Sequence, residues 1–302
     1  MIWQTSRFLI DLSSPRVMGI VNATPDSFSD GGSYFAGVGD LSAIYARCDQ
    51  LVSEGADMLD IGGESTRPGA VPLPLDDELA RVLPVVRYAL QLGVPVSVDT
   101  YKPEVMQAVL DLGADIINDI WALRQTSALT GQSALQVVAQ HPKCGVCLMH
   151  MHGQPTSMQL SPMQGAALPQ VLGFLTERTA MLQSLGVDRQ RVVLDPGIGF
   201  GKTVEQNFEL LACQGQLLAA GYPLLAGWSR KSSLAAVCGT SLASVAQLDV
   251  ASRLVPSVTA ALLAIDRGAR VVRVHDVKET VQAIKVWKAA ATPLAKIGFI
   301  ST

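Results

Sequence analysis

Residues 16–62 read RVMGIVNATPDSFSDGGSYFAGVGDLSAIYARCDQLVSEGADMLDIG, and this stretch carries the pattern that decides the fold. It begins and ends with short apolar runs, 16–22 and 57–62, which are nearly continuous rather than alternating. Such runs are typical of strands covered on both faces, as in a parallel sheet. Between them, apolar residues recur at the spacing of one helix face, at Leu41, Ile44, Cys48 and Leu51. The stretch therefore predicts a strand–helix–strand unit.

The same alternation continues to the end of the chain. Six more short apolar runs are expected to be strands, at 94–99, 115–118, 145–150, 191–195, 223–227 and 270–275. Helix faces are expected at Leu79, Val82, Val86 and Leu90, at Leu172, Leu175, Thr179 and Leu182, and at Val277, Val281, Ile284 and Trp287. We expect Pro84 to bend or split the first of these helices, because proline supplies no N–H and crowds the preceding turn.

Eight strand–helix alternations without a change in composition predict an α/β fold, the closed (β/α)8 TIM barrel. An open doubly wound sheet is the alternative. Because no linker or low-complexity segment interrupts the pattern, residues 1–302 are expected to form a single domain, with the barrel proper at about 16–290 and the first 15 residues outside it. Loops are expected at 27–39, 65–74, 125–132 and 239–247, and long loops in a compact domain are often functional.

The composition excludes several classes of protein. With 49% hydrophobic and 16% charged residues, the chain is expected to bury a large core. A net charge of −3 gives no electrostatic reason to expect nucleic acid or an anionic membrane as a partner. The most apolar stretch, 254–265, is interrupted by Pro256 and is shorter than the roughly 20 residues that span a bilayer. The N-terminus lacks the basic and apolar regions of a secretory signal, so a cytoplasmic protein is expected.

The five cysteines form an odd and scattered set, which does not resemble a disulfide framework. Cys144 and Cys147 form a C-x-x-C pair, but Cys147 lies in an expected strand, where an odd separation directs side chains to opposite faces. We therefore expect both to be buried as small apolar residues rather than to bind zinc or to act in redox chemistry.

Polar or charged residues end nearly every expected strand. They are Asn22, Asp60 with Glu64, Asp99, Asn118, His150, Asp195, Ser229 to Lys231, and Arg273 with His275. In a barrel these ends meet at one mouth, where such enzymes have their active sites. Helix capping explains a single Asp or Asn, but it does not call for Lys, Arg and His at the same face. The cations suit an anion, and the carboxylates suit a heterocycle with N–H donors, so a nitrogen-rich ring with a phosphate end fits both.

Three motifs suggest other functions, but the residues around each motif argue against them. The stretch DPGIGFGKT at 195–203 is similar to a phosphate loop, but Pro196 occupies the position of the first required glycine, and its three glycines are expected to let the backbone approach a ligand. His150 and His152 lack the further ligands of a zinc hydrolase. Lys231 has the chemistry for a Schiff base, but Arg230 and the serines after it favour anion binding.

Taken together, long ordered motifs on all eight expected strands resemble dihydropteroate synthase. They are MGIVNATPDSFSDGG at 18–32, DIGGESTRPG at 60–69, VSVDT at 96–100, IINDI at 116–120, CLMHM at 147–151, LDPGIGFGK at 194–202, SRKS at 229–232 and RVHDV at 273–277. The resemblance implies a (β/α)8 barrel, usually a homodimer. It also implies a reaction that joins 6-hydroxymethyl-7,8-dihydropterin diphosphate to 4-aminobenzoate, with Mg2+ assisting, and forms 7,8-dihydropteroate and pyrophosphate in folate biosynthesis.

The resemblance also implies roles for individual residues. Asn22 is the expected Mg2+ contact, and the expected pterin pocket consists of Asp99, Asn118, Asp195 and Lys231. Arg273 and His275 are the expected diphosphate anchor. The expected aminobenzoate site consists of Phe28, Thr66, Arg67, Pro68, Phe200 and Ser232. By the same resemblance, sulfonamides are expected to compete with 4-aminobenzoate.

Some positions depart from the family pattern. Ala23 replaces a larger apolar residue, Tyr101 replaces a small one, Trp228 precedes SRKS, and the region 125–143 is longer. Tyr101 and Trp228 are expected to lie close enough to the mouth to alter the pocket. Two rival functions are a pterin-binding methyltransferase that serves a corrinoid protein, which would need no diphosphate anchor, and a barrel that binds pterin without turnover.

Overall fold

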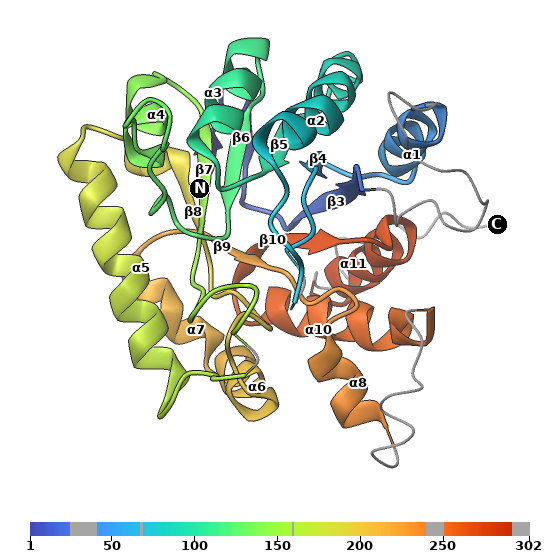
Figure 1. Cartoon of the computed structure of the whole chain (residues 1–302). Helices are drawn as coiled ribbons and strands as arrows, with labels where there is room; N and C mark the ends of the chain where they lie inside the picture. The colour runs from blue at the N-terminus through green and yellow to red at the C-terminus, as the bar shows by residue number, and fades with distance from the viewer. Residues whose placement is uncertain (25–40, 67–68, 159, 240–250, 292–302) are drawn as a thin grey trace.

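The computed structural model describes residues 1–24, 41–66, 69–158, 160–239 and 251–291. Eight parallel strands close into a barrel in chain order, with the last pairing with the first (Figure 1). They are β3 (Arg16–Asn22), β4 (Met58–Gly62), β5 (Val96–Asp99), β6 (Ile116–Asp119), β7 (Gly145–Met149), β8 (Val192–Asp195), β9 (Leu224–Ala226) and β10 (Ala269–Val274). All eight expected strands are confirmed, and the closed barrel excludes the open doubly wound sheet.

Helices surround the barrel (Figure 1). They are α1 (Ser42–Ser53), α2 (Leu75–Ala89), α3 (Pro103–Leu112), α4 (Ala134–Gln140), α5 (Ala167–Ser184), α6 (Val204–Ala212), α7 (Gln214–Leu217), α8 (Ser232–Cys238), α10 (Leu254–Asp266) and α11 (Val277–Ala291). Short 3-10 turns lie at η2 (Arg189–Arg191), η3 (Leu218–Ala220) and η4 (Ala251–Arg253). The expected helix faces are confirmed, since residues such as Ile44, Val86, Leu182 and Ile284 are buried.

Pro84 lies inside α2, which runs through it without a break, so the expectation that it splits the helix is wrong. Val82, Val85 and Val86 on either side of the proline are fully buried against the barrel. This packing holds both halves in one helix, because most helical stability in proteins comes from burial of an apolar face. The loop expected at 125–132 is irregular apart from a bridge between Thr126 and Ser133.

The first 15 residues form an antiparallel hairpin that the sequence analysis did not predict, β1 (Ile2–Gln4) and β2 (Leu9–Asp11). Its fully buried Trp3 and Leu12 pack on the side chains that fill the barrel, including Met18 and Met58. The Trp3 Nε1–H donates to the carbonyl of Arg191, just before β8, at 2.9 Å. The hairpin therefore closes the end of the barrel at which the strands begin.

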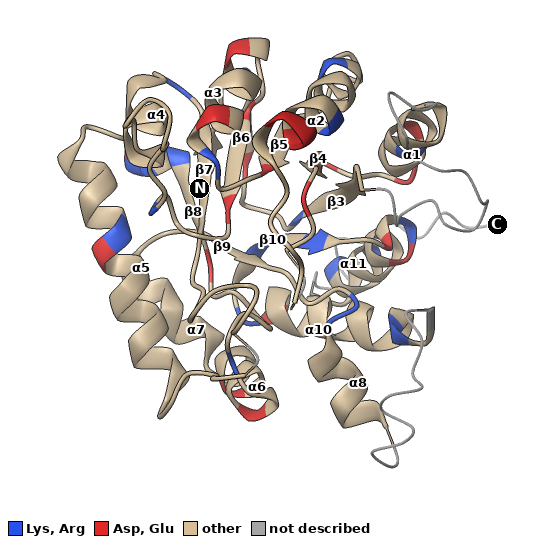
Figure 2. Cartoon of the chain, viewed as in Figure 1, with Lys and Arg blue, Asp and Glu red and all other residues tan. Residues whose placement is uncertain are grey.

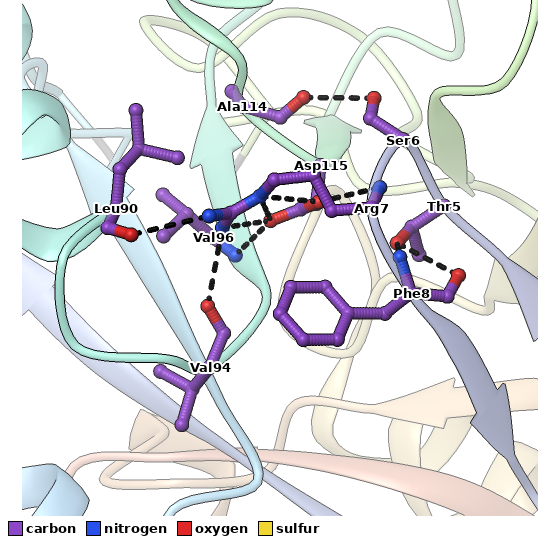
Figure 3. A network of polar contacts seen from close by, with 9 residues as sticks. All are labelled: Thr5, Ser6, Arg7, Phe8, Leu90, Val94, Val96, Ala114 and Asp115. Atoms are coloured by element: carbon purple, nitrogen blue, oxygen red, sulfur yellow. Dashed lines mark hydrogen bonds and ion pairs between the residues drawn. The ribbon is translucent and has the colours of Figure 1, made fainter.

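Arg7 fastens this hairpin to the barrel (Figure 3). Its guanidinium lies 2.6 Å from the buried carboxylate of Asp115 and donates to the carbonyls of Leu90 and Val94 at 3.1 and 3.3 Å. Asp115 also accepts from the backbone N–H of Val96 at 2.9 Å. One carboxylate thus joins the hairpin to the starts of β5 and β6.

All five cysteines are free, and the expected burial of Cys144 and Cys147 is confirmed. Cys147 packs with the side chains that fill the barrel, whereas Cys144 belongs to the layer between strands and helices. Within the described residues, no helix combines the length and hydrophobicity needed to cross a membrane.

Candidate active site

The strands end at a cavity of about 520 Å³, on the side of the barrel opposite to the hairpin. Ten residues expected in the site line its wall: Asn22, Thr66, Asp99, Asn118, Asp195, Phe200, Lys231, Ser232, Arg273 and His275. The other three, Phe28, Arg67 and Pro68, lie outside the described residues. The sequence therefore located the wall of the cavity correctly wherever the structure allows a comparison.

Strand register brings these side chains together. Asn22 pairs with Gly62, Gly62 with Asp99, and Asp99 with Asn118, so the ends of β3 to β6 lie at one level of the barrel. Met149 pairs with Asp195 at the ends of β7 and β8. Figure 2 shows the resulting acidic and basic positions within the ring of strands.

Arg273 lies across the centre of the site. Its Nε is 2.5 Å from Asp60 Oδ2, and one of its terminal nitrogens is 2.7 Å from Asp99 Oδ2. The same Asp60 oxygen accepts from the Asn118 amide at 3.1 Å. The guanidinium therefore orders two carboxylates of the barrel in addition to supplying positive charge to the cavity.

Asp60 is among the polar residues that the sequence predicts at the mouth, but the family resemblance implies no role for it. Its side chain is fully buried beneath the cavity, where it joins Arg273 to Asn118. The available signal was an aspartate inside a run of apolar strand residues, because a buried carboxylate requires a partner.

The two acids on the cavity wall have raised pKa values. Burial raises the pKa of Asp99 to about 7, against the opposing charge of Arg273 and with a further increase from Asp60. Burial also raises the pKa of Asp195, while a 2.7 Å hydrogen bond from the backbone N–H of Gly197 and the charge of Lys231 oppose it. Perturbed carboxylates in a concave site are typical of an active site.

Lys231 lines the cavity just before α8. Its ammonium is 4.3 Å from the centroid of the Phe200 ring, a cation–π contact. A side chain on Gly199 would meet Lys231 Cδ at 3.3 Å, and Gly199 has φ +83°, so glycine is required for this approach. Ser232 is the first residue of α8.

His275 and Arg230 form the side of the cavity nearest β10. The Ser229 hydroxyl lies 3.0 Å from His275 Nδ1 and accepts from the His275 backbone N–H at 3.1 Å. Arg230 has φ +60° and makes two contacts with Asp276, at 2.6 and 3.1 Å. Arg230 lines the cavity, but an ion pair with Asp276 holds its guanidinium. Lys231 and His275, which the sequence predicts at the anion site, also line the cavity.

The glycines after β8 lie in two environments. Gly197 and Gly201 have φ +68° and +67°, and a Cβ on either would lie 1.9 and 2.1 Å from the carbonyl oxygens of His150 and His152, so these two let the backbone approach the segment after β7. Gly199, between them, lines the cavity, where the sequence predicts an approach to a ligand. The buried Lys202 ammonium contacts the carbonyl of Gly197 at 2.8 Å, so it is not placed as the lysine of a phosphate loop.

His150 is buried and packs edge-on against Phe174, with ring centroids 5.1 Å apart. Burial, with the nearby charge of Lys202, lowers the pKa of His150 to about 3. It is a neutral core residue. The described residues contain no group of three or more His, Cys, Asp or Glu side chains that would hold a metal ion.

Asn22 is the residue that the sequence assigned to Mg2+. It lies at the end of β3 and lines both this cavity and a neighbouring one of about 600 Å³, as does His275. Mg2+ keeps several waters and is bound through few protein oxygens together with phosphate oxygens. A single amide oxygen beside an anion site fits an ion that binds with its phosphate ligand.

Neither Tyr101 nor Trp228 is among the residues that line the cavity. Trp228 is buried with its ring 5.3 Å from that of Phe208. Tyr101 donates its hydroxyl to the carboxylate of Glu64, which does line the cavity, at 2.9 Å. Any effect of these two residues on the pocket is therefore exerted through their neighbours.

The barrel and this cavity define a class: an enzyme whose site combines acids and an amide for a nitrogen heterocycle with cations for an anion. The family model described as "Pterin binding enzyme" matches residues 18–275, so the chain is a member of the pterin-binding enzymes. The dihydropteroate synthase of Neisseria meningitidis serogroup C is 45% identical over 290 residues, which cover 95% of this chain and 97% of that protein.

Solved structures similar to this chain are also dihydropteroate synthases. The Xanthomonas albilineans dihydropteroate synthase with 4-aminobenzoic acid has a TM-score of 0.84 and 44% identity, over 97% of this chain and all of that chain. The Burkholderia cenocepacia enzyme complexed with 7,8-dihydropteroate has a TM-score of 0.81 and 43% identity, over 96% of both chains. The Yersinia pestis enzyme in a sulfonamide drug complex has a TM-score of 0.86 and 38% identity, over 97% and 100%. The chain belongs to the dihydropteroate synthase family.

Proposed function

We propose that this protein condenses 6-hydroxymethyl-7,8-dihydropterin diphosphate with 4-aminobenzoate, which yields 7,8-dihydropteroate and pyrophosphate in folate biosynthesis. The observation that carries the proposal is the cavity whose lining combines Asp99, Asn118 and Asp195 with Lys231, Arg273 and His275. Two relatives with 45% and 44% identity over nearly the whole chain are named dihydropteroate synthase, and family members have been solved with 7,8-dihydropteroate and with 4-aminobenzoic acid.

Pterin binding is assigned to the acids and the amide. The amino and ring N–H groups of a pterin are donors, and carboxylates are acceptors. Asp195 is held by the N–H of Gly197, and Asp99 by Arg273, so both are oriented before substrate arrives. Lys231 also lines the cavity and is suited to the carbonyl side of the ring.

Departure of the diphosphate is assigned to the side of the cavity at the ends of β3 and β10. His275 and Asn22, with the positive charge of Arg273, are suited to the phosphate oxygens. When bound with the substrate at Asn22, Mg2+ would neutralise charge on the leaving group. Loss of pyrophosphate leaves positive charge on the pterin and its methylene, and the carboxylates of Asp99 and Asp195 stabilise that charge.

The amine substrate is assigned to the residues over the pterin pocket. Thr66, Phe200 and Ser232 lie on the cavity wall, and Phe28, Arg67 and Pro68 complete the proposed site from segments outside the described residues. The aromatic ring of 4-aminobenzoate is suited to Phe200 and its carboxylate to the start of α8. The amine then needs positioning rather than a strong base.

The deciding experiment measures pyrophosphate release from purified protein with dihydropterin diphosphate, 4-aminobenzoate and Mg2+. We expect release that requires the amine, and a Lys231→Ala variant slower than the parent by roughly tenfold or more. Release no faster than in a blank without protein would refute the proposal. Methyl transfer to a corrinoid protein in place of condensation would favour the rival methyltransferase.

We also propose that sulfonamides compete with 4-aminobenzoate; the Yersinia pestis relative, solved in a sulfonamide drug complex, supports this proposal. Inhibition should be relieved by excess 4-aminobenzoate but not by excess pterin substrate. Two further proposals rest on the family resemblance, a homodimer and a cytoplasmic location.

A further inference from the structure

A second polar cluster lies beside the cavity, where β4 and β5 end next to α2 and α3 (Figure 1). Two carboxylates, Glu64 and Glu78, share the ammonium of Lys102, which contacts both. The Tyr101 hydroxyl donates to Glu64 Oε1 at 2.9 Å, and the Thr100 hydroxyl donates to Glu78 Oε1 at 2.7 Å. The reaction scheme above uses none of these five side chains.

The cluster is well shielded from solvent. Exposed fractions of the side chains are 1% for Glu78, 8% for Glu64 and 14% for Lys102. Hydrogen bonds and ion pairs in such an environment are stronger than at an exposed surface, and they restrict the groups that they join. The Lys102 ammonium also lies 4.9 Å from the centroid of the Tyr101 ring, so Tyr101 contacts both the acid and its counter-ion.

Glu64 connects this cluster to the cavity. Glu64, Ser65 and Thr66 all line the cavity, and Thr66 belongs to the proposed 4-aminobenzoate site. The chain is fastened on both sides of Thr66, because Arg81 donates to the carbonyl of Gly63 at 3.2 Å and Gly69 donates to the carbonyl of Pro155 at 3.1 Å. Glu64 is the anchor nearest to Thr66 on its N-terminal side.

We propose that Tyr101 and Lys102 are positioning residues for 4-aminobenzoate, because they hold Glu64 and thereby the segment 64–66 at the cavity wall. This inference rests on the proposed function. The pterin pocket is built on the side chains of Asp99, Asn118 and Asp195, whose hydrogen bonds among the described residues are to Arg273, to Asp60 and to the Gly197 N–H rather than to the side chains of the cluster. Loss of the Tyr101 hydroxyl should therefore affect the amine substrate and spare the pterin.

The test is Tyr101→Phe, which removes one hydrogen bond and keeps the ring and every charge. With each substrate varied in turn, the KM for 4-aminobenzoate should rise roughly three- to tenfold, as expected for a hydrogen bond to a partly buried carboxylate. The KM for the dihydropterin diphosphate should stay within about twofold of the parent value, since the pterin pocket is untouched. Glu64→Gln keeps the acceptor oxygen but loses the charge that attracts Lys102. Like Tyr101→Phe, it should raise the KM for 4-aminobenzoate and leave the KM for the dihydropterin diphosphate nearly unchanged.

The matched control is Tyr88→Phe. Tyr88 also donates its hydroxyl to a carboxylate, Asp49 Oδ2 at 2.7 Å, but this hydrogen bond joins α2 to α1, and Tyr88 does not line the cavity. Tyr88→Phe should leave both KM values unchanged. Equal changes in both KM values of Tyr101→Phe, or no change in either, would overturn the inference. Absence of pyrophosphate release by the parent protein would instead overturn the proposed function.

Discussion

Individual residues decide the shape of the cavity where the backbone leaves no choice. Gly197 and Gly201 bring the chain after β8 against the chain after β7, with no room for a Cβ. This approach places Asp195 under a backbone N–H and Phe200 at the cavity wall. The Lys202 ammonium contacts the carbonyls of both neighbouring segments and joins them.

Gly197→Ala should destabilise the fold by about 2–4 kcal/mol, the sum of left-handed backbone strain and overpacking against the His150 carbonyl. The control is Gly186→Ala, because Gly186 has φ +80° but no atom lies within 4 Å of its Cβ position. It should lose only about 1 kcal/mol. Denaturant unfolding of both variants measures the difference, and equal losses would show that the close approach is unimportant.

Asp99 makes substrate binding depend on pH. Its pKa is raised to about 7, chiefly by burial, and only the carboxylate form accepts two N–H donors. The kcat/KM for the pterin substrate should therefore fall as pH drops below about 7, by roughly tenfold per pH unit. The raised pKa of Asp99 also makes the free energy of unfolding depend on pH. Protonation of Asp99 contributes stability that is fully present below pH 3.8, its ordinary pKa, and is lost as the pH rises through about 7. Asp99→Asn should bind the pterin more weakly with no dependence on this titration, and an identical pH profile would exclude Asp99 as its source.

At the scale of elements, the N-terminal hairpin closes the barrel end that the helices leave open. Its two strands have three residues each, too few for alternation to indicate a strand. Trp3 and Leu12 become core residues only because the barrel supplies the surface that buries them. The Arg7–Asp115 contact fixes the hairpin in place (Figure 3).

Arg7→Ala should destabilise the protein by about 2–3 kcal/mol, because it leaves the buried Asp115 carboxylate without its counter-ion. Arg16→Ala is the control: it removes an ion pair with Asp57 in which both side chains are about 30% exposed, and an exposed hydrogen bond to the carbonyl of Asp11 in the hairpin, so it should cost only about 1 kcal/mol. Unfolding in denaturant gives both values. A loss for Arg7→Ala no larger than for Arg16→Ala would contradict the fastening role.

At the scale of the whole molecule, large apolar side chains are exposed on two helices that contact each other. On α8 and α10, Val237, Val255 and Leu263 are 57%, 72% and 39% exposed. Exposed apolar surface is typical of an interface between protein copies where it is contiguous. We assign these two helices to the interface of the proposed homodimer.

Val255→Asp should therefore convert the proposed dimer to a monomer, because a two-fold interface would bury the new charge twice. Sedimentation velocity at micromolar concentration measures the change. Leu129→Asp is the control, since Leu129 is 77% exposed in the loop before α4 and should leave the oligomeric state unchanged. A parent protein that sediments as a monomer would refute the assignment.

The sequence by itself determined the barrel, the eight strands and the ring of polar residues at their ends. These features follow from local periodicity, and from the rule that parallel strands in a barrel end at one mouth. The sequence therefore predicted that Asn22, Asp99, Asn118 and Asp195 lie at one mouth of the barrel, and all four line the same cavity.

Only the tertiary structure decided which of these residues contact one another and with what protonation. Asp60 and Arg273 are 213 positions apart, and nothing in their surroundings in sequence indicates that they pair. Contacts between distant parts of the chain also explain three other features that the sequence did not predict. They are the buried Lys202 ammonium, the hairpin that closes the barrel and the raised pKa of Asp99. Burial and strand register act between distant parts of the chain, so they exist only once the barrel has closed.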